Sequence, residues 1–358
     1  MHILVTNDDG PPSRQSSPYV HSLVIELQKA GHSVSVILPD TQRSWIGKAH
    51  IVGQPIKPSY YRPGNLHQDD GTTHSRPYNP TTTSNSNSLN GANSNGSSGD
   101  SHASDVEEWI LIPSTPASCI QLGLHHFFQS RGPIDLVISG PNYGRNTTAV
   151  FALSSGTLGG ALEAAVCGYK AIALSYAFFD RENKPELIQE ASTFSVKLVE
   201  RLAREQKFWD EGSGGLGGGR LYSVNVPLKE GVSARKVVWT EVLQNRWRGS
   251  SCFSEVEVPE EEDEGPEEVE GRVRRQEVEE EIGGQEVGEG NGGGEERQHV
   301  RHTHKHFKWA PVFRDVHESV EKSGPGNDGW AIREGYSSVT PLRANFMHVS
   351  GFEGELKL

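Results

Sequence analysis

Apolar residues open the chain in an order that predicts a strand, a helix and a second strand. Residues 3–5 form a short apolar run, and residues 20–27 place apolar side chains at helical spacing. Ser17 fits an N-cap and Pro18 the first helical position. The apolar positions of residues 34–38 then follow the two-residue period of a strand. Together these elements predict a βαβ unit, the beginning of a parallel sheet covered by helices.

Strand and helix patterns continue to alternate along most of the chain. Short apolar runs predict strands, and longer runs with helical periodicity predict helices. The predicted strands cover residues 109–112, 134–138, 171–175 and 221–226, and the predicted helices cover residues 120–128, 156–166 and 187–202. After residue 237 the pattern changes to strand-like pieces, with a final extended segment over residues 330–339. We therefore expect an α/β fold with a Rossmann-like, three-layer α/β/α arrangement, a mostly parallel sheet and a C-terminal β-rich extension.

Two segments lack the apolar residues that a folded core needs. Residues 63–105 are mostly Asn, Ser, Thr and Gly, and residues 255–303 are rich in Glu and Gly. Such segments bury too little apolar surface to offset the entropy of ordering, so we expect both to be disordered insertions. The rest of the sequence then predicts a single domain over residues 1–346, with residues 347–358 as a C-terminal tail.

Charge and cysteine content narrow the class of protein. The formal net charge is −13, which disfavours stable nucleic-acid binding and membrane association because both reward clustered Lys and Arg. The three cysteines show no CxxC spacing, so a reducing compartment is the simpler expectation. The N-terminus has no signal-peptide pattern, and no run approaches the roughly 18 apolar residues of a membrane span. We expect a cytoplasmic protein that does not enter the membrane.

The strongest chemical signal is the pair Asp8 and Asp9, directly after the first predicted strand. The carboxyl edge of an open parallel sheet is where ligands bind. Adjacent carboxylates repel each other unless a cation, a proton or strong donors offset their charge. The pair therefore suits a hard metal such as Mg²⁺ or Mn²⁺, although an Asx-type turn with solvated acids fits the same residues.

Other polar residues are predicted at the same edge of the sheet. Asn142 and Asn146 follow the strand that ends near residue 138, and Ser44 follows the second strand. Ser155 begins a small-residue helix, where free N–H groups and the helix dipole favour an anion such as phosphate. Each has an ordinary explanation as well: a polar loop for the asparagines, a surface loop for Ser44 and a helix cap for Ser155. Together these residues are stronger evidence for a ligand site than each is alone, because the predicted fold brings the strand ends together.

The ordered series LVTNDDG, PDTQRS, STPASCIQLGL, DLVISGPNYGRN, SSGTLGGALEA and GYSSVTPL resembles the SurE family of survival-protein nucleotidases and phosphatases. The segments NDDGPPS and SGPNYGRN resemble the fungal branch of that family. The resemblance covers most of residues 1–62, 106–252 and 307–346, and it leaves both insertions outside. It implies the SurE fold, a divalent metal, and nucleoside monophosphates or other small phosphomonoesters as substrates.

The resemblance also implies roles for single residues. It assigns the metal to Asp8, Asp9, Ser44 and Asn142, and the phosphate to Asn146, Ser155, Gly156 and Thr157. Two departures matter: the loop after Gly10 reads Pro-Pro-Ser, and Pro141 replaces the aliphatic residue of bacterial members. Bacterial substrate preferences are therefore not transferred. Many members exchange a C-terminal hairpin between subunits, so a homodimer is a candidate assembly, but the acidic insertion falls in that region.

The expected chemistry is direct attack of water on a metal-bound phosphate, with Asp8 or Asp9 accepting the proton of the water. A covalent aspartyl-phosphate is the competing mechanism, less expected here because the two acids are adjacent. The alternative function is non-enzymatic: a catalytically silent module that has the same fold and senses phosphate or binds a protein partner. A phosphoacceptor receiver domain fits poorly, because Asp135 lies within its predicted strand.

Overall fold

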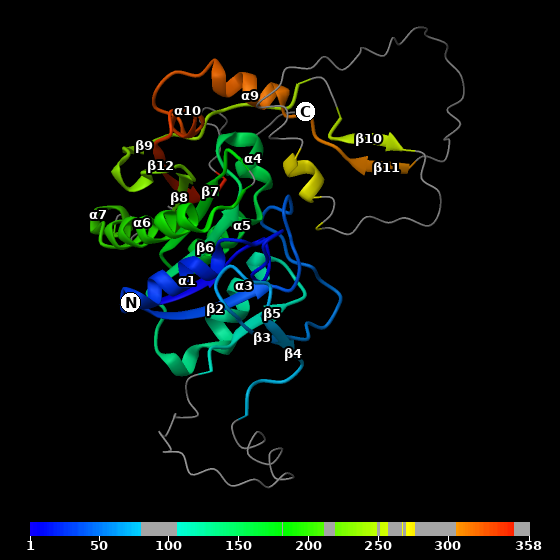
Figure 1. Ribbon diagram of the computed structural model, residues 1–358, viewed down its shortest axis with the longest axis vertical. Helices are drawn as coiled ribbons and strands as arrows, with labels where there is room; N and C mark the ends of the chain where they lie inside the picture. Colours follow the sequence, from blue (N-terminus) through cyan, green and yellow to red (C-terminus); the bar gives the residue numbers. More distant parts are fainter. Residues whose placement is uncertain are drawn as a thin grey trace, which may run out of the picture.

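The computed structural model describes residues 1–79, 106–180, 182–210, 219–248, 251–256, 267, 270–275 and 306–346. Its main feature is a ten-stranded sheet in the order β4-β3-β5-β2-β1-β6-β7-β8-β12-β9. The six strands from β5 to β8 in this order are mutually parallel, whereas β3 and β12 run antiparallel to β5 and β8. Figure 1 shows helices on both faces of this sheet. The three-layer, mostly parallel α/β fold expected from the sequence is thus confirmed, as are the additional C-terminal strands.

The strands are β1 (His2–Thr6), β2 (Ser33–Pro39), β3 (Ser59–Arg62), β4 (Thr72–His74), β5 (Trp109–Ile112), β6 (Leu136–Tyr143), β7 (Ala171–Ala177), β8 (Gly219–Pro227), β9 (Val237–Trp239), β10 (Phe253–Val256), β11 (His306–Trp309) and β12 (Ser337–Ala344). The α-helices are α1 (Val20–Lys29), α3 (Pro116–Leu122), α4 (Thr148–Ser154), α5 (Gly156–Val166), α6 (Pro185–Ala203), α7 (Gln206–Asp210), α9 (Arg314–Glu321) and α10 (Asp328–Arg333). Short π or 3₁₀ turns occupy Gly123–Phe127, Gln129–Arg131 and Val232–Ala234.

Successive residues of the central strands point to opposite faces of the sheet and build two separate cores. On one face, Ile3 and Val5 pack with the apolar sides of α1 and α6. On the other face, Leu4 packs with α3 and α5. Because both faces are covered, the central strands are mostly apolar, as is usual in parallel sheets. Most polar side chains inside them are small, such as Ser35 of β2 and Ser223 of β8, and the adjacent acids Asp8 and Asp9 lie beyond the end of β1.

Three local predictions differ from the structure. Helix α1 begins at Val20 and not at Pro18. The Ser17 hydroxyl accepts from Asn7 Nδ2 at 3.1 Å and donates to the Gly10 carbonyl oxygen at 2.9 Å, so it is engaged away from the helix N-terminus. Strand β6 continues to Tyr143 through a register shift. The predicted extended segment 330–339 begins within helix α10, which Asn327 caps by accepting from the Trp330 N–H, and only residues 337–339 belong to strand β12.

Parts of the two predicted insertions are ordered. Strand β4 lies within 63–105, where it pairs with β3, and residues 270–275 of the segment 255–303 are helical. In both places, tertiary contacts order sequences that carry little local signal. Residues 80–105, 276–305 and 347–358 lie outside the described residues.

The C-terminal region adds a second, smaller sheet and two helices. Strands β10 and β11 pair antiparallel, and Figure 1 shows this ribbon standing away from the main sheet, with the turn at 270–275 between it and the body. In the described ranges, no single helix is long and apolar enough to cross a membrane; α4 and α5 satisfy the criterion only as a pair bent by 67°.

Candidate functional site

Five of the residues predicted from the sequence line one small cavity at the carboxyl edge of the sheet. These residues are Asp8, Ser44, Asn142, Asn146 and Ser155. They follow or end different strands and helices, and the parallel strand order brings them together. The cavity has a volume of about 50 Å³. The other predicted residues lie next to the cavity in the interior: Asp9 is 1% exposed, and Gly156 and Thr157 are buried.

Asp8 is held by the N-terminus of helix α5. The Thr157 hydroxyl donates to Asp8 Oδ1 at 2.6 Å. At Gly156 an added Cβ would lie 2.8 Å from the Cβ of Asp8 and 2.8 Å from the Arg43 carbonyl oxygen. Glycine at this position therefore lets the helix approach the carboxylate closely. Gly156 and Thr157 thus orient an acid here, and the phosphate-holding role that the family resemblance implies stays a prediction.

Asp9 accepts two short hydrogen bonds from opposite sides. The Tyr143 backbone N–H donates to Oδ2 at 2.6 Å, and Arg274 Nη2 donates to Oδ1 at 2.7 Å. The Asp9 side chain is 1% exposed and that of Arg274 is 5% exposed. Asp9 is therefore the acceptor of a desolvated, charge-assisted ion pair.

The loop that carries both acids is fixed by its own polar residues. Asn7 Nδ2 donates to the Gly10 carbonyl oxygen at 2.9 Å, and the Gly10 N–H donates back to Asn7 Oδ1 at 3.0 Å. Gly10 has φ +87°, a left-handed conformation that favours glycine. The Asn-Asp-Asp-Gly sequence therefore forms a rigid turn that directs both carboxylates to the sheet edge.

Burial controls the electrostatics of the pair. Loss of hydration, together with the neighbouring carboxylate of Asp9, raises the pKa of Asp8 to about 7. Burial also raises the pKa of Asp9, and the Arg274 guanidinium opposes that shift. Two adjacent carboxylates in this environment require positive charge to remain ionised.

The asparagines present neutral oxygen atoms to the cavity. Asn142 Nδ2 donates to the Gly144 carbonyl oxygen, and Asn146 Nδ2 donates to the Ser175 hydroxyl, both at 2.9 Å. The Asn146 N–H also donates to Asn225 Oδ1 at 2.8 Å. These bonds use the amide nitrogens, and within the described residues neither side-chain oxygen has a donor. Both oxygens are thus left for a ligand.

Ser155 and Ser44 differ in the hydrogen bonds that their hydroxyl groups make. Ser155 Oγ accepts from the Leu158 N–H at 3.0 Å and caps α5, so its hydroxyl follows the ordinary helix-cap interpretation. Ser44 Oγ lies 3.3 Å from the Gln42 amide and lines the cavity. Ser44 accordingly lines the cavity with a hydroxyl that does not cap a described helix.

Sequence reasoning missed two charged residues of the site. Arg274 and Glu270 both line the cavity, and they lie 3.3 Å apart from Arg274 Nε to Glu270 Oε1. Both come from the segment that we expected to be disordered. The signal available was the basic and apolar run Gly271-Arg272-Val273-Arg274-Arg275 inside an otherwise acidic stretch.

The donor set fits a hard divalent cation. Two buried carboxylates, a hydroxyl and two amide oxygens without donors are the ligand types that Mg²⁺ and Mn²⁺ prefer. The described ranges contain no group of three or more His, Cys, Asp or Glu side chains arranged to hold a metal ion. Any metal here would thus depend on the Ser and Asn oxygens in addition to the acids.

A mostly parallel sheet with helices on both faces defines an open-sheet α/β protein, a class in which the carboxyl edge of the sheet is the usual place for a site. The sequence profile described as Survival protein SurE matches residues 3–249. A 5'-nucleotidase SurE of Ruegeria pomeroyi is 30% identical, with 96% of this chain and 95% of that protein covered. The chain belongs to the SurE family, as the sequence motifs indicated.

Two further similarities concern a fungal protein and a solved structure. A Saccharomyces cerevisiae protein named as a probable tubulin–tyrosine ligase is 32% identical across 100% of this chain, which spans only 43% of that protein. The crystal structure of the SurE protein from Aquifex aeolicus has a TM-score of 0.55 and 20% identity, with 97% of this chain and 95% of that chain covered. The structural similarity supports the fold alone.

Proposed function

We propose that the chain is a divalent-metal-dependent phosphomonoester hydrolase that acts on nucleoside monophosphates or related small phosphomonoesters. One observation carries the proposal: Asp8 and Asp9 are buried at the end of β1, and neutral oxygens of Ser44 and Asn142 lie around the same cavity. Relatives named 5'-nucleotidase support hydrolysis of a nucleotide phosphate.

The metal would be Mg²⁺ or Mn²⁺, with Asp8, Asp9, Ser44 and Asn142 as its ligands. When bound, it would withdraw charge from the phosphate and lower the pKa of a water molecule. The protein contributes the geometry: Thr157 fixes the rotation of the Asp8 carboxylate, and the Tyr143 N–H fixes that of Asp9. Preorganisation of this kind avoids reorganisation during the reaction.

The remaining residues would bind the phosphate and move one proton. Asn146 is anchored by its backbone N–H and by one Nδ2 hydrogen, and its second Nδ2 hydrogen would donate to a phosphate oxygen. Ser155, Gly156 and Thr157 place the N-terminus of α5 at the cavity, where the helix dipole favours an anion. Asp8 or Asp9 would accept the proton of the attacking water.

Isotope labelling tests direct attack of water on the phosphate. In a single turnover in ¹⁸O-labelled water, direct attack places the label in the released phosphate. A covalent aspartyl-phosphate that water opens at the carboxyl carbon would place the label in an aspartate instead, whereas one that water opens at phosphorus also labels the phosphate. Absence of label in the phosphate therefore contradicts direct attack.

The central experiment measures phosphate release from a panel of nucleoside monophosphates and an aryl phosphate, with Mg²⁺, Mn²⁺ or EDTA. Wild type is compared with Asp8→Asn and Asp9→Asn, and with Glu318→Gln, which removes an exposed carboxylate of α9. We expect metal-dependent release in wild type and in Glu318→Gln only.

The alternative function is a silent phosphate-sensing or protein-interaction module on the same fold. No release from folded, metal-loaded wild type would favour that module, as would partner binding that survives both active-site substitutions. The ligase named for the yeast relative is not transferred, because this chain spans less than half of that protein.

A further inference from the structure

Arg274 reaches the acidic pair from a distant part of the sequence. It lies on the helical turn at residues 270–275 and is separated from Asp9 by 265 positions. Val273 on the same turn is 1% exposed and packs with Phe151 and Phe313. Arg272 Nη2 donates to the Trp309 carbonyl oxygen at 2.7 Å. The turn is thus seated against both α4 and β11.

Each nitrogen of the Arg274 guanidinium has an acceptor. Nη2 contacts Asp9 and Nε contacts Glu270. With the Gln42 amide oxygen facing the guanidinium, which is the orientation that its partners favour, it accepts from Nη2 at 2.8 Å and from Nη1 at 3.1 Å. The guanidinium also lies over the Tyr143 ring, 4.4 Å from its centroid. Arg274 is therefore arranged to neutralise Asp9.

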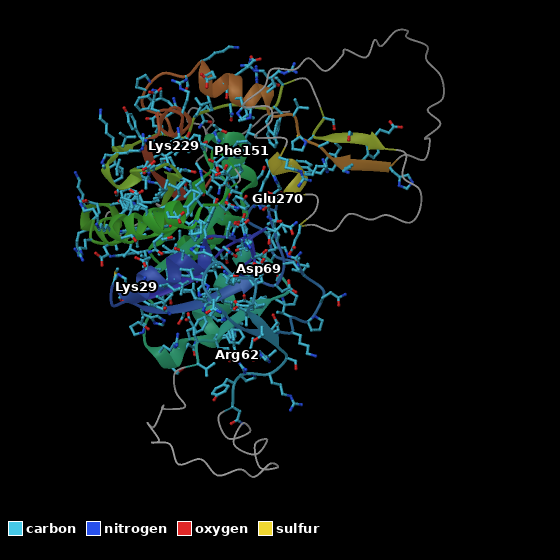
Figure 2. The ribbon with its side chains drawn as sticks, in the orientation of Figure 1. Lys29, Arg62, Asp69, Phe151, Lys229 and Glu270 are labelled. Carbon is cyan, nitrogen blue, oxygen red and sulfur yellow. The ribbon has the colours of Figure 1, made fainter. Side chains whose placement is uncertain are left out.

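The same turn limits the space above the acids. The cavity of about 50 Å³ is lined by Glu270, Val273 and Arg274 on one side, whereas small-molecule sites have volumes of about 300 Å³ or more. In Figure 2, Glu270 and Phe151 are both labelled where the turn meets α4. The cavity therefore cannot enclose a whole nucleoside monophosphate while the turn is in this position.

We propose that Arg274 is an internal counter-ion that competes with the divalent cation for Asp9, so that cation binding displaces the guanidinium and opens the site to substrate. A divalent ion and a guanidinium repel each other strongly when both contact one buried carboxylate. Glu270, which already contacts Nε, provides a second acceptor for the displaced guanidinium. The inference rests on the proposed function, because it concerns the cation that the hydrolase needs.

The test is calorimetric titration of Mn²⁺ into the full, metal-free chain. Arg274→Gln removes the competing charge, so it should bind Mn²⁺ at least about 10-fold more tightly than wild type. Arg274→Lys keeps the charge but not the planar set of donors, so its affinity should lie between those of wild type and Arg274→Gln. Arg275→Gln is the matched control: it removes the same charge from an exposed position on the same turn and should change the affinity by less than about twofold.

Hydrogen-exchange mass spectrometry of wild type gives a second readout that needs no variant. Mn²⁺ should speed exchange of the backbone amides of residues 270–275, because the turn loses its ion pair with Asp9. Unchanged or slower exchange in that peptide overturns the displacement, even if Arg274→Gln does not fold.

Failure of the inference and failure of the proposed function give different results. If phosphate release is metal-dependent but Arg274→Gln binds Mn²⁺ no more tightly than wild type, Arg274 does not compete with the cation. The proposed hydrolase function is then unaffected. If wild type and Asp9→Asn bind Mn²⁺ equally, the proposed metal site is wrong. The proposed competition between Arg274 and the cation is then wrong as well.

Discussion

The acidic and the basic parts of the site are built in different ways. Asp8 and Asp9 lie on a turn between β1 and α1 and are held by backbone and side-chain donors from β6 and α5. Arg274 and Glu270 lie on a short helical turn that contacts the body through Val273 and Arg272. The acidic part therefore belongs to the core of the sheet, and the basic part is a peripheral segment docked onto it. Positioning by the core suits the ligands of a cation, and docking through the side chains of one short turn suits a group that must leave.

The largest expected effect is on the acidic part. Asp8→Asn should lower Mn²⁺-dependent phosphate release on the order of 10³-fold, because a metal ligand and a candidate base are lost together. In EDTA at about pH 8 the same variant should be more stable than wild type by at least about 1 kcal/mol, since burial raises the pKa of Asp8 to about 7. Chemical unfolding and phosphate assays check both. A destabilised or fully active variant would contradict this view of the acidic pair.

The next prediction concerns how the acidic part is positioned. In Gly156→Ala the new Cβ would meet the Asp8 Cβ and the Arg43 carbonyl oxygen at 2.8 Å, so α5 must shift. We expect about 100-fold slower phosphate release and about 1–3 kcal/mol lower stability. Gly324→Ala is the matched control, because no atom lies within 4 Å of its added Cβ. Equal rates for the two variants would mean that close approach of the helix is unimportant.

The third prediction concerns the pH dependence of stability at Asp328, a buried acid that connects the C-terminal region to α4. Its carboxylate accepts from the backbone N–H groups of Thr148 and Leu243, and burial raises its pKa from 3.8 to about 6. The folded chain thus binds this proton more tightly than the unfolded chain. Its stabilisation is complete below about pH 4 and is lost as the pH rises through about 6.

The corresponding experiment compares the pH dependence of unfolding in wild type and Asp328→Asn. Between about pH 5 and about pH 7.5, wild type should lose about 1 kcal/mol more than the variant. Parallel pH profiles for the two proteins would show that Asp328 has the same proton affinity in the folded and unfolded chain.

The smallest expected effect is on the basic part. Val273→Ala removes apolar contact from the turn, and it should tighten Mn²⁺ binding by about two- to threefold, because the turn leaves Asp9 more readily. Global stability should change by less than about 0.5 kcal/mol, since peripheral segments open separately from the core. Calorimetry and chemical unfolding measure the two quantities. A stability loss near 2 kcal/mol would place the turn in the cooperative core and remove the contrast between the two parts.

Much of the fold was predictable because its signals are local. The short apolar runs at β1, β6 and β7 and the helical period of α6 predict the elements directly, and alternating elements predict a parallel sheet. The misplaced elements have specific causes: Ser17 is engaged with Gly10 and does not cap α1, and α10 depends on a cap at Asn327 just before it. Such details rest on which of several competing hydrogen bonds forms.

The sequence by itself determined the α/β class, the family, and the convergence of Asp8, Ser44 and Asn142 on one cavity, because carboxyl ends of parallel strands share one edge. Tertiary structure alone decided that Thr157 orients Asp8 and that Arg274 pairs with Asp9 across 265 positions. Strand periodicity is written locally in the chain, whereas the docking of a distant turn depends on complementary charge and apolar contact that arise only after the sheet has formed.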